Sequence, residues 1–164
     1  MSIAALGEVL IRYCPQESDA LGHGQPSCAA PFLRSVGGSE FNTLVALRHL
    51  GREARLVTVL PSRGQPLGDL ARQCAADAGV ELHLSEAPAS AEVGSFTVVP
   101  AQKVVHYRRS TSAFWTEQPA DGFAWGSALE GCAWVHATGI TAQCGDAARA
   151  QWTAHLEQCV RPVF

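Results

Sequence analysis

Val36-Gly37-Gly38-Ser39-Glu40-Phe41-Asn42 is the stretch that decides the fold, because it leads from an extended segment into a helix. Two adjacent glycines let the backbone turn tightly and let a ligand approach main-chain atoms. The helix start offers unpaired N–H groups, and Asn42 can both donate to and accept from a hydroxyl group. Two interpretations remain open: one wall of a pocket for a small, hydroxyl-rich ligand, or an ordinary loop in which Ser39 caps the helix.

Helical and extended patterns alternate on both sides of this stretch. Apolar residues follow at helical spacing as far as Leu50, and Gly51 is placed to end that helix. Further helices are predicted at 70–78 and 146–159, with a short one at 123–129. Strands are predicted at 3–6, 9–13, 56–60, 80–84, 93–99, 103–109 and 132–137, with a strand beginning at 160–164. Loops are predicted at 61–68 and at 15–31, the second holding an edge strand or two and closing with Phe32-Leu33.

This order of segments predicts an α/β fold with a parallel central sheet and right-handed crossovers. The strands at 93–99 and 103–109 flank Pro100-Ala101-Gln102 at a spacing typical of a hairpin. A domain that stopped at a strand beginning near residue 160 would leave a sheet edge uncovered. We therefore expect these 164 residues to be a truncated part of a larger domain.

Composition narrows the class of protein. Hydrophobic residues make up 47% of the chain and charged residues 16%, which predicts a compact core, while a net charge of −3 gives no basic field for nucleic acid. No apolar stretch is long enough to cross a bilayer, and the N-terminus does not have the pattern of a signal peptide. The six cysteines include no CxxC pair, so reduced thiols in the cytoplasm are favoured over a disulfide framework. A zinc site built from distant ligands is the alternative.

Lys103–Arg109 is a second candidate for function. Strand alternation places His106 and Arg108 on one face, with Tyr107 and Arg109 on the other. An arginine beside a histidine suits a carboxylate or a phosphate. The alternative is a solvated edge strand that carries charge for protection.

Polar residues also follow two of the predicted buried strands. Glu8 comes after the first strand, and Thr138-Gly139-Ile140-Thr141 follows the strand at 132–137. Ligands of open α/β sheets bind at the carboxyl ends of the strands, so both segments are expected at one crevice. The sequence contains neither GxxxxGK[ST] nor GxGxxG after the first strand, and neither HExxH nor GxSxG.

Together these segments resemble the ribokinase-like (PfkB) carbohydrate kinases, and most of all the 2-keto-3-deoxygluconate kinase branch. The resemblance covers nearly the whole chain and follows the order of motifs in the family. It rests on Gly7–Arg12, Val36–Asn42, Leu50-Gly51, Pro66–Gly68, Ala78–Val80, Val105–Arg109 and Thr138–Thr141.

The resemblance implies a parallel sheet flanked by helices, with a small β lid drawn from about 12–33 and 93–109. It implies that residues 1–164 are the sugar-binding portion of a kinase domain. The positions of Gly38 and Asn42 hold the sugar, and that of Arg108 holds the carboxylate of a sugar acid. Phe96 and His106 stand where tyrosine is common in that branch. The implied substrate-binding set is Glu8, Gly37, Gly38, Asn42, Phe96, His106, Arg108 and Ile140.

In the family, the C-terminal half supplies the GAGD-type anion hole, the aspartate base and the ATP pocket. The intact enzyme would use ATP and Mg²⁺ to phosphorylate a sugar or a 2-keto-3-deoxy sugar acid. No catalytic, cofactor or metal residue is assigned in this chain, so we expect it to be inactive alone. Two alternatives remain: a non-catalytic fragment that binds sugar or dimerises through the lid strands, and an unrelated Rossmann-like domain.

Overall fold

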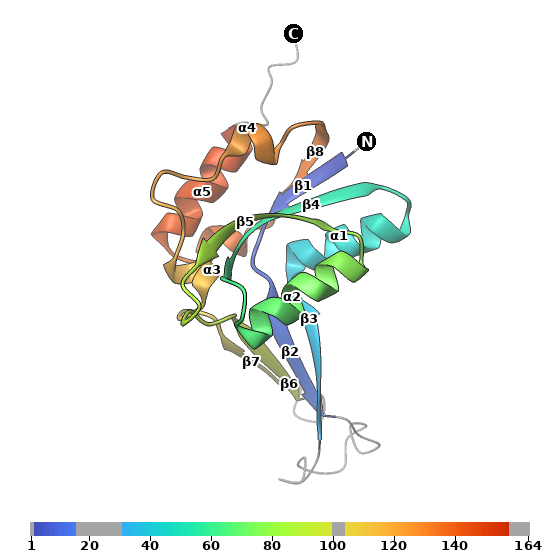
Figure 1. Cartoon of the computed structure of the whole chain (residues 1–164), viewed down its shortest axis with the longest axis vertical. Helices are drawn as coiled ribbons and strands as arrows, with labels where there is room; N and C mark the ends of the chain where they lie inside the picture. The colour runs from blue at the N-terminus through green and yellow to red at the C-terminus, as the bar shows by residue number, and fades with distance from the viewer. Residues whose placement is uncertain (1, 16–30, 100–103, 158–164) are drawn as a thin grey trace.

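The structure is a computed structural model that describes residues 2–15, 31–99 and 104–157. Its central sheet is parallel throughout, with strand order β5-β4-β1-β8 (Figure 1). The strands are β1 (Ser2–Leu6), β4 (Glu53–Pro61), β5 (Glu81–Ala87) and β8 (Cys132–His136). The helices are α1 (Ser39–His49), α2 (Pro66–Asp77), α3 (Ala113–Thr116), α4 (Trp125–Ala128) and α5 (Asp146–Glu157), with a 3-10 turn, η3 (Thr141–Gln143).

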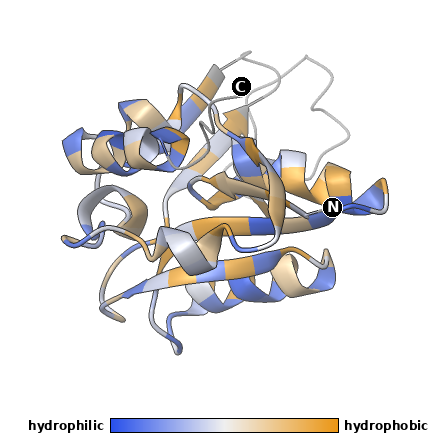
Figure 2. Ribbon diagram, turned by 90° about the horizontal axis from the view of Figure 1, so that it is seen from above, coloured by the Kyte–Doolittle hydropathy of each residue, from blue (hydrophilic) through white to orange (hydrophobic). Residues whose placement is uncertain are grey.

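Alternation along β4 explains why helices cover both faces of this sheet. Leu56 and Leu60 pack into a core shared with α1 and α2, whereas Val57 and Val59 pack into a second core shared with α3, α4 and α5. All four side chains are at most 2% exposed. Figure 2 shows hydrophobic residues along the central strands and a mixture of hydrophobic and hydrophilic residues on the flanking helices. The α/β class predicted from the segment order is thereby confirmed.

A second, mixed sheet projects from the carboxyl end of the first (Figure 1). Its order is β3-β2-β6-β7, with antiparallel pairs at either edge and a parallel pair in the middle. The strands are β2 (Leu10–Pro15), β3 (Phe32–Gly37), β6 (Ser95–Val99) and β7 (Val104–Arg108). The antiparallel β6–β7 pair confirms the predicted hairpin. This sheet argues against the simple Rossmann-like alternative, for which no such sheet is expected.

Several boundaries differ from the sequence predictions for local reasons. The helix predicted from residue 70 begins at Pro66, because the Gln65 side chain accepts a hydrogen bond from the Gly68 N–H at 2.6 Å and proline suits the first turn. Strand β3 extends to Gly37, and α3 and η3 were not predicted. The edge strand within 16–30, the turn at 100–103 and the strand at 160–164 lie outside the described residues. Within the described part of the chain, no helix has the length and hydropathy to cross a membrane.

Candidate functional site

The candidate site is a pocket where the carboxyl end of β1 meets the start of α1 and one face of the second sheet. Its volume is about 230 Å³, which suits a small ligand. The lining residues are Glu8, Leu10, Gly38, Ser39, Glu40, Asn42, Phe96, Tyr107, Arg109 and Ile140. These residues come from five separate segments of the chain, which only the tertiary fold brings together.

Gly38 fixes how helix α1 enters the pocket. It is the N-cap of α1 with φ of 137°, and a Cβ atom at this position would lie 2.3 Å from the main-chain oxygen of Glu8. Only glycine tolerates both conditions. The Ser39 side chain does not cap the helix, so the predicted cap was wrong; its hydroxyl donates to Glu40 instead. The backbone of the helix start therefore lies directly against the end of β1, with Asn42 one turn further into the pocket wall.

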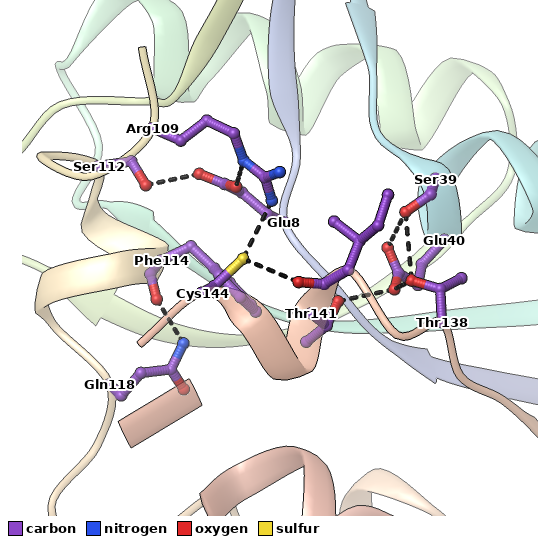
Figure 3. Close-up of polar contacts among 11 residues, drawn as sticks. Glu8, Ser39, Glu40, Arg109, Ser112, Phe114, Gln118, Thr138, Thr141 and Cys144 are labelled. Carbon is purple, nitrogen blue, oxygen red and sulfur yellow. Dashed lines mark hydrogen bonds and ion pairs between the residues drawn. The ribbon is translucent and has the colours of Figure 1, made fainter. Parts of the chain in front are cut away.

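Glu8 is held in the floor of the pocket by two side chains from the segment after β7. Its Oε2 accepts from Arg109 Nε at 2.7 Å and its Oε1 accepts from Ser112 Oγ at 2.5 Å (Figure 3). A Cβ atom on Gly94 would come within 2.4 Å of Oε1, so glycine is needed there. Burial raises the pKa of Glu8 even though Arg109 and Ser112 oppose that shift. The pocket thus contains a carboxylate whose oxygens already have donors.

Arg109 is fixed in position by contacts on several sides. Its guanidinium carbon lies 5.9 Å from the centre of the Tyr107 ring and 5.7 Å from that of the Trp115 ring. Its Nη2 donates to Cys144 Sγ at 3.0 Å. The bonds to Glu8 and Cys144 occupy two of the five N–H donors of a guanidinium, so the group can offer others to a ligand.

Burial raises the pKa of the Cys144 thiol to about 11, so this sulfur is a poor nucleophile.

A second carboxylate, Glu40, links the start of α1 to the loop that follows β8. It is 1% exposed. Its Oε1 accepts from the hydroxyls of Thr138 and Thr141, the second at 2.7 Å, and its Oε2 accepts from Ser39 at 2.6 Å (Figure 3). The same loop contributes Ile140 to the pocket lining. Glu40 was not among the residues selected from the sequence.

The structure brings together most of the residues selected from the sequence, but not all of them. Those that line the pocket are Glu8, Gly38, Asn42, Phe96 and Ile140. Gly37 lies beside the pocket, since a Cβ atom there would be 3.7 Å from Asn42 Oδ1 and from the Phe96 ring. Whether any of these positions binds a substrate stays a prediction.

His106 and Arg108 are absent from the described pocket lining. In the β6–β7 register Tyr107 lies opposite Phe96, with ring centroids 5.6 Å apart, so Tyr107 and Arg109 face the pocket. Arg108 points to the other side, is 71% exposed and donates to Glu92 at 2.7 Å. Alternation along the strand had separated these two pairs correctly. The missing information was which face of the strand meets the pocket.

Metal binding finds no support in the described part of the chain, where no three His, Cys, Asp or Glu side chains form a cluster that could hold an ion. Cys14, Cys74, Cys132 and Cys144 are free thiols there. Cys28 and Cys159 lie outside the described residues. The zinc alternative is therefore not supported by these four cysteines.

Comparisons with known proteins place this fold among sugar kinases. It matches the solved 2-dehydro-3-deoxygluconokinase of Thermotoga maritima with a TM-score of 0.81 and 26% identity, over 97% of this chain and 47% of that one. It matches a PfkB family carbohydrate kinase of Listeria grayi with a TM-score of 0.75 and 24% identity, over 96% of this chain and 47% of that one. A fructokinase of Xylella fastidiosa with bound ATP matches with a TM-score of 0.73 and 22% identity, over 94% of this chain and 49% of that one.

The chain thus has the fold of one part of a ribokinase-like (PfkB) carbohydrate kinase. It spans about half the length of the solved structures that it matches. No family model and no curated protein matches the sequence. The structural resemblance predicted from the ordered motifs is confirmed.

Proposed function

We propose that this chain is the substrate-binding part of a carbohydrate kinase, and that its ligand is a 2-keto-3-deoxy sugar acid. The observation that carries this proposal is a pocket lined both by Arg109, which its contacts hold in place, and by Asn42 near the start of α1. Arg109 would receive the ligand carboxylate, while Asn42 and the start of α1 would bind its hydroxyls. The similarity to the Thermotoga maritima enzyme supports this class of ligand.

The geometry favours Arg109 over Arg108 for the carboxylate. Arg109 lines the pocket, whereas Arg108 is 71% exposed and paired with Glu92. A ligand carboxylate would share Arg109 with Glu8, which places an acidic group beside the ligand and limits how tightly an anion binds. We therefore expect weak to moderate affinity in the chain alone.

Phosphate transfer would need groups that the resemblance assigns to the other half of the kinase. ATP and Mg²⁺ are expected partners of the intact enzyme and not of this part. Phosphoryl transfer depends on positioning and on stabilising charge, and this chain offers no assigned base or anion hole. We therefore propose that the 164 residues alone bind the sugar acid without phosphorylating it, and that the protein acts in the cytoplasm.

Isothermal titration of the purified chain tests the binding proposal, with 2-keto-3-deoxygluconate and ribose as the two ligands. Saturable binding of the acid that exceeds binding of ribose supports the proposal. Arg109→Gln should weaken binding of the acid at least tenfold, about 1.4 kcal/mol, and leave ribose unaffected. Arg108→Gln is the matched control and should bind like the parent chain. Transfer of labelled phosphate from ATP by the chain alone would contradict the predicted inactivity.

Dimerisation through the second sheet is the other candidate function, and exposed apolar side chains favour it. Strand pairing puts Leu33, Val105 and Tyr107 on the face that also carries Phe96, and they are 55%, 44% and 62% exposed. A second copy of the chain could cover this face. Analytical ultracentrifugation tests this proposal: Val105→Asp should shift a dimer towards monomer, and a monomeric parent chain would exclude it.

A further inference from the structure

Glu40 is an unusual residue to bury at the edge of this pocket. It is 1% exposed, and every donor recorded for its carboxylate is a hydroxyl. Among the described residues, no basic side chain forms an ion pair with it. The fold also reserves space for it, because a Cβ atom on Gly7 would lie 2.6 Å from the Cβ of Glu40. A buried carboxylate without a cation costs stability, so stability alone does not account for its presence.

The hydroxyl protons around Glu40 determine which groups the pocket can offer to a ligand. A serine or threonine hydroxyl has one proton and two lone pairs. Ser39 donates its proton to Glu40 Oε2, and Thr138 donates its proton to Glu40 Oε1. Although the two hydroxyl oxygens are 3.5 Å apart, neither has a proton left for the other. Ser39, which lines the pocket, therefore presents only lone pairs towards a ligand.

We infer that Glu40 is a positioning residue that makes Ser39 an obligate hydrogen-bond acceptor, so that the pocket selects a ligand group that can donate a proton. A sugar hydroxyl at this point satisfies Ser39, whereas a carboxylate or carbonyl oxygen is repelled by its lone pairs. This inference rests on the proposed function and refines it. It orients the ligand with a hydroxyl at Ser39 and directs its carboxylate away from Glu40, towards Arg109 at the end of β7.

Glu40→Gln tests the inference because it nearly preserves shape and reverses one hydrogen bond. The amide oxygen can still accept from Thr138 and Thr141, but the amide nitrogen donates to Ser39. Ser39 must then turn its own proton towards the pocket. We expect binding of 2-keto-3-deoxygluconate to weaken about tenfold, while the melting temperature stays equal or rises because a buried charge is gone.

A double-mutant cycle separates this role from a general effect on the pocket. Ser39→Ala should also weaken binding about tenfold. The double variant Ser39→Ala with Glu40→Gln should bind no more weakly than either single variant. Thr43→Val is the matched control on the same helix, since its hydroxyl donates only to the Ser39 carbonyl at 3.1 Å and it does not line the pocket. This variant should bind like the parent chain.

The outcomes distinguish the inference from the proposed function. If the parent chain binds and Glu40→Gln binds equally well, or if the two losses multiply towards a hundredfold, the inference is overturned and the proposed function stands. A large drop in the melting temperature of Glu40→Gln would assign Glu40 a purely structural role and overturn the inference as well. If the parent chain gives no binding heat, the proposed function fails and the inference fails with it.

Discussion

Acid should destabilise this protein through His155, a fully buried residue of α5. Its side chain is 0% exposed, and its ring centre lies 4.9 Å from that of Trp125. Burial lowers the pKa of His155 from 6.5 to about 4, against opposing effects from a backbone hydrogen bond with His136 and the charge of Glu40. The folded protein therefore keeps this imidazole neutral at a pH where the unfolded chain has already protonated it.

The size and sign of the effect follow from the two pKa values. Below pH 6.5 the His155 imidazole binds a proton in the unfolded chain but not in the folded protein, so the free energy of unfolding falls as the pH falls. The loss is complete near pH 4, where the folded protein also takes up the proton. Between 6.5 and about 4, at about 1.4 kcal/mol per pH unit, the loss amounts to roughly 3 kcal/mol. This is a large fraction of the stability of an ordinary domain.

Urea unfolding followed by tryptophan fluorescence measures this effect at several pH values between 7 and 4. The glutamine side chain in His155→Gln does not titrate, so this variant should lose less stability than the parent chain on acidification. From pH 7 to pH 4 the unfolding free energy of the parent chain should fall by roughly 3 kcal/mol relative to that of His155→Gln. The raised pKa of Glu8 makes stability fall as the pH rises above 4.5. Because both proteins contain Glu8, this contribution cancels when their unfolding free energies are compared. Parallel curves for the two proteins would refute this reasoning.

Two further predictions concern the pocket walls. Gly38→Ala should lower the free energy of unfolding by about 3 kcal/mol, because it combines a φ of 137° with a 2.3 Å approach to the Glu8 oxygen. Gly51→Ala, with φ of 74° and no atom within 4 Å, should lose only about 1 kcal/mol, and equal losses in urea unfolding would contradict the steric argument. Glu8→Ala should lower the free energy of unfolding by about 3 kcal/mol by leaving the donors of Arg109 and Ser112 without an acceptor, while Glu8→Gln, whose amide oxygen can still accept, should lower it much less. Similar melting temperatures for these two Glu8 variants would show that the charge of Glu8, and not its ability to accept hydrogen bonds, carries the effect.

Hydrophobic periodicity was sufficient to predict most of the central sheet and its helices. Leu56–Leu60 alternates between two cores, and Gly51 ends α1 with φ of 74°, as its position after Leu50 indicates. Periodicity was not sufficient for α3 and η3, which are each only one turn long. Such short elements are stabilised by contacts with distant residues and leave little signal in the local sequence.

The sequence by itself determined the α/β order and the glycine-rich start of α1, because these depend on neighbours along the chain. It also separated His106 and Arg108 from Tyr107 and Arg109, because side chains alternate along a strand. Only the tertiary structure decided which pair meets the pocket, since that depends on the register with β6. It also decided the role of Glu40, whose hydroxyl donors Thr138 and Thr141 lie about a hundred residues away. Contacts at such separations are set by packing of the whole domain, and local sequence patterns do not specify them.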